Sequence, residues 1–320
     1  MVDVVAPDAR GLARAVAALR AGDLVAFPTE TVYGLGADAL RAEAVSAIFA
    51  AKGRPADNPL IVHLADATQV GRVVGSWTPL ARRLAAEWWP GPLTLVLDAA
   101  PAVPSVTTGG LTTVAVRVPD HPVAQTLLRE ADLPVAAPSA NRSGRPSPTS
   151  AAHVAADFGA AVRLVLDGGQ CPVGVESTVV DARGNRPLVL REGSISREQL
   201  GAVDEATGPD ALRASPGTRY RHYAPECRVV VARPGDAERL AAGLRDQGRH
   251  VGLVATGPAP DGVTEIARFA DAAGLAQQFY AALRAAETAG VDVVVVEAVD
   301  EAGVGRAVMD RLRRAAAGAD

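Results

Sequence analysis

The chain has 320 residues, of which 48 % are hydrophobic, 21 % charged and 4 % aromatic, and its formal net charge is −4. This composition is typical of a globular protein with one or two domains, and the acidic balance argues against a broad electrostatic grip on nucleic acid. No apolar run reaches the roughly 18 residues of a membrane span, no signal peptide is recognisable after Met1, and Cys171 and Cys227 form no paired pattern. We therefore expect a cytoplasmic protein without a disulfide framework or a zinc site.

Short apolar runs that alternate with helical patterns predict an α/β domain in the first two thirds of the chain. A helix is predicted over Ala42–Lys52, because Val45, Ile48 and Phe49 share one stripe and Gly53 is a stop signal. The predicted strands are 24–27, 60–64, 93–97, 113–118, 133–137, 164–166, 178–180 and 187–190.

Strands and helices alternate more regularly from residue 228 onward. The predicted strands there are 228–232, 250–255 and 291–297, and the predicted helices are 236–246, 274–286 and 307–317. This order predicts a small, mostly parallel, Rossmann-like α/β domain over 228–320, after a first domain over 1–208 and a linker over 209–227. The linker segment 215–225, SPGTRYRHYAP, holds two of the four tyrosines of the chain. We expect it to act as a lid over a ligand, since a passive tether is usually small and polar.

Polar segments follow several of the predicted strands. Neither a GxxxxGK[ST] loop nor a complete dinucleotide fingerprint occurs, because Gly34-Leu35-Gly36 lacks the third glycine. Any phosphate site is therefore of a non-standard kind. The candidate segments, rich in hydroxyls, glycines and backbone N–H groups, are 27–36, 138–147, 174–178 and 190–193. Each of them, taken alone, could equally be a polar turn.

Thr113 and Arg117 lie four residues apart on a predicted strand in which Val114, Val116 and Val118 alternate with them. They therefore share the face opposite the valines. An arginine on so apolar a strand needs an anionic partner. That partner is either a carboxylate of the protein or a bound substrate.

Lys52 and His63 each have a structural and a functional interpretation. Lys52 is the single lysine among 32 basic residues. It is either a cation that complements the end of its helix or the compact ammonium of a tight anion site, where arginine would not serve. His63 stands within an apolar strand, where a lone histidine is more often a core residue than a ligand.

Six segments occur in an order and spacing that resemble the YrdC-type domain of L-threonylcarbamoyladenylate synthases. They are FPTETVYGLG (27–36), KGRPADNPL (52–60), WWPGPLTL (88–95), VAVRVP (114–119), APSANRSGRPSPT (137–149) and GVESTVVD (174–181). The linker SPGTRYRHYAP and the segment GRAVMDRL (305–312) resemble the long form of that family, which adds a C-terminal α/β domain. The resemblance covers nearly the whole chain. Thr218-Arg219 departs from the Met-Lys that is common in the family.

The resemblance implies a twisted mixed sheet with flanking helices around a basic cavity. It also implies synthesis of L-threonylcarbamoyl-AMP and diphosphate from L-threonine, bicarbonate and ATP, with Mg²⁺ arriving on ATP and no dedicated protein ligands for the metal. Lys52 and Arg54 would be catalytic, on the phosphates. The residues that would hold L-threonine are Thr31, His63, Arg117, Ala137 and Ser177. Those that would hold ATP are Lys52, Arg54, Asn58, Thr113, Ser139, Asn141, Ser147, Arg191, Tyr220 and His222.

A downstream transferase complex would place the threonylcarbamoyl group on tRNA, so we expect this chain to contact tRNA weakly or indirectly. Two alternatives use the same domain. A carbamoyltransferase of hydrogenase maturation would carry zinc-finger cysteines, and this chain has two cysteines in all. An RNA-binding or ribosome-assembly module would use the same cavity without catalysis. It would give steeply salt-dependent tRNA binding.

Overall fold

The computed structural model describes residues 2–201, 204–205 and 223–317, which form two compact units. The first unit comprises 2–143, 148–172, 176–201 and 204–205, and the second comprises 144–147, 173–175 and 223–317. The expected domain junction at 208–209, most of the expected lid, and Tyr220 and His222 lie outside the described residues. None of the described helices is long and apolar enough to cross a membrane.

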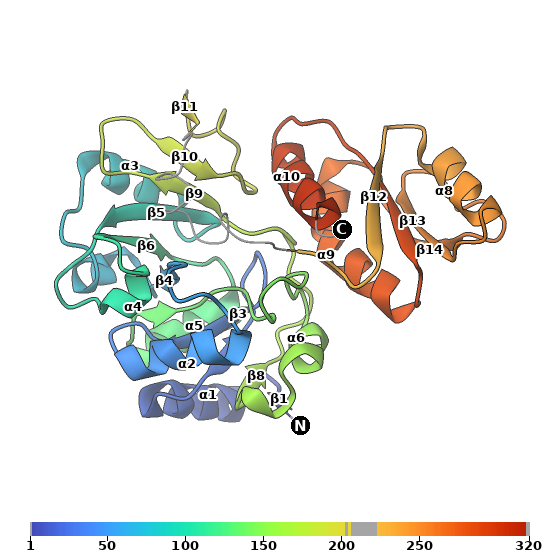
Figure 1. Ribbon diagram of the computed structural model, residues 1–320. Helices are drawn as coiled ribbons and strands as arrows, with labels where there is room; N and C mark the ends of the chain where they lie inside the picture. Colours follow the sequence, from blue (N-terminus) through green and yellow to red (C-terminus); the bar gives the residue numbers. More distant parts are fainter. Residues whose placement is uncertain (1, 202–203, 206–222, 318–320) are drawn as a thin grey trace. The chain divides into compact units, whose positions relative to one another are not determined.

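A mixed sheet forms the centre of the first unit, as the resemblance implies (Figure 1). Among the described residues it has 11 strands in the order β1-β8-β2-β3-β7-β4-β6-β5-β9-β10-β11. Their bounds are β1 Asp3–Val5, β2 Val25–Phe27, β3 Gly34–Asp38, β4 Ile61–His63, β5 Leu93–Asp98, β6 Thr113–Arg117, β7 Val135–Ala136, β8 Leu164–Leu166, β9 Thr178–Asp181, β10 Leu188–Arg191 and β11 Asp204–Glu205.

Helices cover both faces of this sheet. They are α1 Ala9–Ala21, α2 Ala42–Lys52, α3 Pro79–Trp88, α4 Ser105–Thr108, α5 Pro122–Ala131 and α6 Ala151–Phe158, with the short 3-10 helices η1 Ala67–Arg72 and η2 Gly159–Ala161. Because strand side chains alternate, neighbouring residues enter different cores. Ala26 packs in the core that contains residues of α2 and α3, whereas Val25 and Phe27 pack in the core under α1 and α5.

Strand β3 replaces the turn that the sequence predicts at 27–36. Gly34–Asp38 pairs antiparallel with β2 and with β7. Glycines are poor strand formers, and this explains why the pattern conceals the strand. Gly36 is required there, since a Cβ would lie 2.8 Å from the ring of Phe27 and 2.9 Å from Val135. Tight packing between neighbours therefore determines the residue type.

The second unit is a parallel α/β fold, which confirms the prediction. Its four strands have the order β12-β15-β13-β14 and pair in parallel. Their bounds are β12 Arg228–Ala232, β13 Val251–Ala255, β14 Thr264–Arg268 and β15 Val293–Glu297. The helices are α8 Ala237–Asp246, α9 Ala272–Thr288 and α10 Val304–Ala316. Strand β14 is absent from the prediction, because this edge strand is only half buried and its apolar pattern is weak.

Candidate active site

One face of the first sheet carries polar side chains beside a small apolar cluster. The cluster consists of Ile61, Val96, Ala115 and Val179, from the adjacent strands β4, β5, β6 and β9. Residues two positions away along a strand share its face. The polar side chains placed on this face in that way are His63, Thr94, Thr113, Arg117 and Ser177. The valines of β6 lie in the opposite core, as the alternation predicts.

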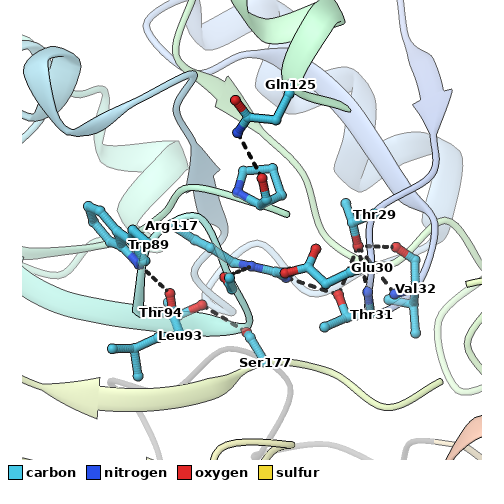
Figure 2. Close-up of polar contacts among 12 residues, drawn as sticks. Thr29, Glu30, Thr31, Val32, Trp89, Leu93, Thr94, Arg117, Gln125 and Ser177 are labelled. Atoms are coloured by element: carbon cyan, nitrogen blue, oxygen red, sulfur yellow. Dashed lines mark hydrogen bonds and ion pairs between the residues drawn. The ribbon is translucent and has the colours of Figure 1, made fainter. Parts of the chain in front are cut away.

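Arg117 is the charged centre of this face (Figure 2). It ends β6 and is 3 % exposed. Its Nε donates to the carbonyl of Gly91 at 3.1 Å, and its Nη1 donates to the Thr31 hydroxyl at 2.9 Å. Its Nη2 lies 2.5 Å from Oε1 of Glu30, which is also buried. Of the two partners that the sequence allows, the structure thus contains a carboxylate of the protein itself.

A directed chain of hydroxyls positions Thr31. Thr29 donates its hydroxyl hydrogen to the carbonyl of Val32 at 2.6 Å. The Thr29 and Thr31 oxygens are 2.8 Å apart. Since a hydroxyl has one hydrogen, Thr31 donates to Thr29 and is left to accept from Arg117. Both threonines are 1 % exposed, so these hydrogen bonds next to Glu30 are shielded from solvent.

His63 is neutral at this site. Burial and, to a lesser extent, the positive charge of Arg117 lower the pKa of His63 to about 3. Its ring meets Phe27 edge to face, with centroids 6.1 Å apart. Within the described residues its Nδ1 has no hydrogen-bond partner. The backbone groups of Ile61 and Val135 interact with the ring and raise its pKa, so His63 is a partly satisfied core histidine with one ring nitrogen left over.

Ser177 connects two sets of residues predicted to bind different substrates. Its hydroxyl lies 2.8 Å from that of Thr94. Arg191, at the end of β10, donates from Nη2 to the Ser177 hydroxyl at 3.2 Å and to its carbonyl at 2.9 Å. A predicted threonine ligand and a predicted ATP ligand are thus in direct contact.

Lys52 is buried and bound to a loop. It ends α2, is 3 % exposed, and donates from Nζ to the carbonyl of Ser139 at 2.5 Å and to that of Asn141. Burial lowers the pKa of Lys52 well below its usual range, and Arg54 lowers it further, while Asp157 opposes them. A cation that only complemented a helix end would lie at the surface, so the structure disfavours that interpretation.

Two more predicted ATP ligands lie close to Lys52, one just after its helix and one in the loop that it binds. Arg54 donates to the carbonyl of Asn58 at 3.3 Å and to that of Pro59 at 3.0 Å. The Ser139 hydroxyl donates to the side-chain carbonyl of Asn141 at 2.6 Å.

Backbone contacts join this loop to the turn that holds Thr31. Gly34 pairs with Ser139 in an isolated bridge, and the N–H of Ala140 donates to the carbonyl of Tyr33 at 2.7 Å. The loop that Lys52 binds is therefore attached to the segment that carries Thr31, which contacts Arg117.

The remaining candidates are less closely connected. Thr113 begins β6, at the end opposite Arg117. Ala137 donates its N–H to the carbonyl of Ile61 at 2.9 Å. Ser147 is fully buried and belongs to the segment 144–147 of the second unit. In that segment the carbonyl of Pro146 accepts from Arg284 at 2.5 Å.

Sequence reasoning does not single out Glu30, Thr29 or Thr94. The available signal for Glu30 is an acid flanked by two threonines directly after an apolar strand. Its meaning depends on Arg117, which only the sheet brings near. Among the described residues, no group of three His, Cys, Asp or Glu side chains could hold a metal ion. Delivery of Mg²⁺ by ATP remains a prediction.

The chain is similar to known proteins over most of its length. Residues 17–193 match a family described as telomere recombination, and residues 195–317 match one described as threonylcarbamoyl-AMP synthase, C-terminal domain. The threonylcarbamoyl-AMP synthase of Pyrococcus abyssi is 46 % identical, over 93 % of this chain and 91 % of that protein. That of Bacillus subtilis is 43 % identical, over 96 % and 93 %. A crystal structure of P. abyssi Sua5 complexed with L-threonine has a TM-score of 0.93 and 42 % identity, and the match covers 100 % of this chain and 98 % of that one.

Proposed function

Since this chain belongs to the family of threonylcarbamoyl-AMP synthases, in the form with a C-terminal domain, we propose that it joins L-threonine, bicarbonate and ATP. The products are L-threonylcarbamoyl-AMP, diphosphate and water. The downstream step is the transfer of the threonylcarbamoyl group to an adenosine of tRNA by a separate transferase complex. We expect this work to take place in the cytoplasm.

The observation that carries the proposal is the arrangement around Arg117. A buried guanidinium suits a substrate carboxylate, because its fork matches the two carboxylate oxygens. The hydroxyls of Thr31 and Ser177 and the neutral imidazole of His63 provide polar contacts of the kind that a small hydroxy amino acid requires. The apolar cluster on the same face offers a surface for a methyl group.

The chemistry requires no nucleophile from the protein. The amine of threonine, once it has lost its ammonium proton, attacks the carbon of bicarbonate and forms a carbamate with release of water. A carbamate oxygen then attacks the α-phosphorus of ATP, which releases diphosphate. Catalysis is therefore positioning together with stabilisation of charge. We assign Lys52 and Arg54 to the phosphates. The buried ammonium of Lys52 holds the Ser139–Asn141 turn through two carbonyls and retains a third N–H for a ligand.

The direct test follows diphosphate release in the presence of ATP, Mg²⁺ and bicarbonate with a series of amino acids. L-Threonine should give the product and omission of bicarbonate should abolish it. Serine should be a weaker substrate, because the missing methyl is worth about 1–3 kcal/mol. Release that is independent of the amino acid, or formation of ADP, would contradict the proposed function.

A further inference from the structure

Glu30 is a buried acid for which the proposed roles so far leave no task. It is 5 % exposed and stands between the two threonines of the turn (Figure 2). Its Oε1 lies 2.5 Å from Nη2 of Arg117. Arg117 is therefore charge-paired inside the protein, although it is also the residue best suited to a substrate carboxylate.

The contact between these two groups is electrostatically paired but poorly hydrogen-bonded. Within the described residues, neither carboxylate oxygen of Glu30 nor Nη2 of Arg117 has a hydrogen-bond partner of acceptable geometry. A buried ion pair with a purely structural role needs such hydrogen bonds to offset the desolvation of both ions. Glu30 can therefore still accept hydrogen bonds, and Arg117 can still donate them, to a ligand bound beside the pair.

The other titratable groups that face Glu30 supply no competing charge. Burial raises the pKa of the Cys171 thiol to about 12, and burial lowers the pKa of His121. The Nδ1 atom of His121 accepts from the N–H of Val123 at 3.2 Å, as expected for a neutral ring. His63 is neutral as well, through its lowered pKa. Glu30 and Arg117 are thus the two opposite charges around this contact.

We propose that Glu30 binds the ammonium group of the amino-acid substrate while Arg117 binds its carboxylate. This inference rests on the proposed function, which supplies an amino acid as substrate. The ammonium and the carboxylate of a free amino acid are attached to the same carbon. They therefore fit two opposite protein charges that are already adjacent. Binding replaces one poorly bonded ion pair by two charge-assisted contacts. A ligand that lacks either charge leaves one buried protein ion without its new partner, and this selects for free amino acids.

The experiment compares L-threonine with its analogue of matched stereochemistry, 2,3-dihydroxybutyrate, in which a hydroxyl replaces the ammonium. Affinities are measured by calorimetry for the wild type and Glu30→Gln. The variant should bind L-threonine about 10- to 100-fold more weakly, as expected for a lost charged hydrogen bond. The affinity of the variant for the analogue should equal or exceed that of the wild type, because the buried negative charge near the analogue carboxylate is gone.

Two further variants make the outcome decisive. Glu30→Asp keeps the charge and should still prefer L-threonine over the analogue. Glu297→Gln alters a glutamate of the second unit that is similarly buried, at 4 % exposure, and should leave both affinities unchanged. Unchanged L-threonine affinity in Glu30→Gln, or an equal loss of both ligands, would overturn the inference and leave Glu30 a structural counter-ion. A wild type that binds no L-threonine would instead contradict the proposed function.

Discussion

Glu30 and Glu297 are buried glutamates of the two units, and their oxygens are satisfied to different degrees. At Glu297, Oε1 accepts from the N–H of Gly235 at 2.7 Å, and Oε2 accepts from the N–H and the hydroxyl of Thr256 at 2.7 and 2.8 Å. At Glu30 neither oxygen has a hydrogen bond from a described residue. Burial alone therefore does not distinguish a functional acid from a structural one. The distinction lies in the hydrogen-bonding capacity that the fold leaves over.

The position of Glu297 explains its saturation. It ends β15, which lies between β12 and β13, and the loops after these two strands provide Gly235 and Thr256. The carboxyl edge of a parallel sheet is where α/β folds usually bind ligands. Here a carboxylate of the chain itself takes backbone N–H groups that would suit a phosphate, and so joins two loops to the sheet.

The largest expected effect comes from removing the partner of Glu30. Arg117→Gln leaves a buried carboxylate without its counter-charge, so it should lower the free energy of unfolding by about 3–5 kcal/mol. It should also abolish threonine-dependent diphosphate release. In the double variant Glu30→Gln/Arg117→Gln much of the stability should return, but not the activity. Urea unfolding measures this difference, and equal stability of the two variants would show that the pair is not electrostatically coupled.

Lys52 tests whether a cation that is bound to carbonyls still acts on a ligand. Lys52→Ala should reduce turnover about 10²–10³-fold, the usual effect of losing one charge-stabilising donor. Lys52→Arg should also be impaired, since a planar guanidinium does not reproduce the two short contacts of the ammonium with the carbonyls of Ser139 and Asn141. Steady-state diphosphate assays measure both variants. Wild-type turnover in both would return Lys52 to a structural role.

Glu297→Gln should destabilise the second unit through the loss of hydrogen bonds to a charged carboxylate. Burial alone would raise the pKa of Glu297, but hydrogen bonds from Gly235 and Thr256 outweigh it, so the pKa is lowered. The stabilisation is therefore present above the unfolded pKa of about 4.3 and is lost as the pH falls through the lower folded value. The variant should lose about 1–3 kcal/mol at neutral pH. It should also lose less stability on acidification than the wild type, and an identical acid profile would refute the assignment.

His63 should give the smallest effect, with its own dependence on pH. The folded pKa is about 3, so the folded state stays neutral while the unfolded chain takes up a proton below about pH 6.5. The stabilisation is complete above that pH and declines as the pH falls toward 3, by at most about 1.4 kcal/mol per pH unit. Urea unfolding of the wild type and His63→Asn at about pH 7.5, 6 and 5 should show a shallower decline for the variant. Parallel curves would mean that His63 is protonated in the folded state.

Local patterns in the sequence predict much of the fold. The bounds of α2 and β12 agree with their predictions, because a stop glycine and a β-branched run mark them. The strands that escape prediction, such as β3 and β14, depend on pairing partners elsewhere in the chain. At the site, the shared face of Thr113 and Arg117 follows from alternation along one strand. The role of Glu30 does not, because it depends on which hydrogen bonds the assembled fold leaves unmade.

The burial of Lys52 has a practical consequence, since Lys52 is the single lysine of the chain. A protease that cleaves only after lysine therefore has one cutting point, and it lies where the ammonium is bound to the carbonyls of Ser139 and Asn141. Cleavage requires this corner to open, so its rate reports the population of the open form. The rate at which two fragments appear thus measures local opening around Lys52. Ligands that hold the loop closed should lower this rate.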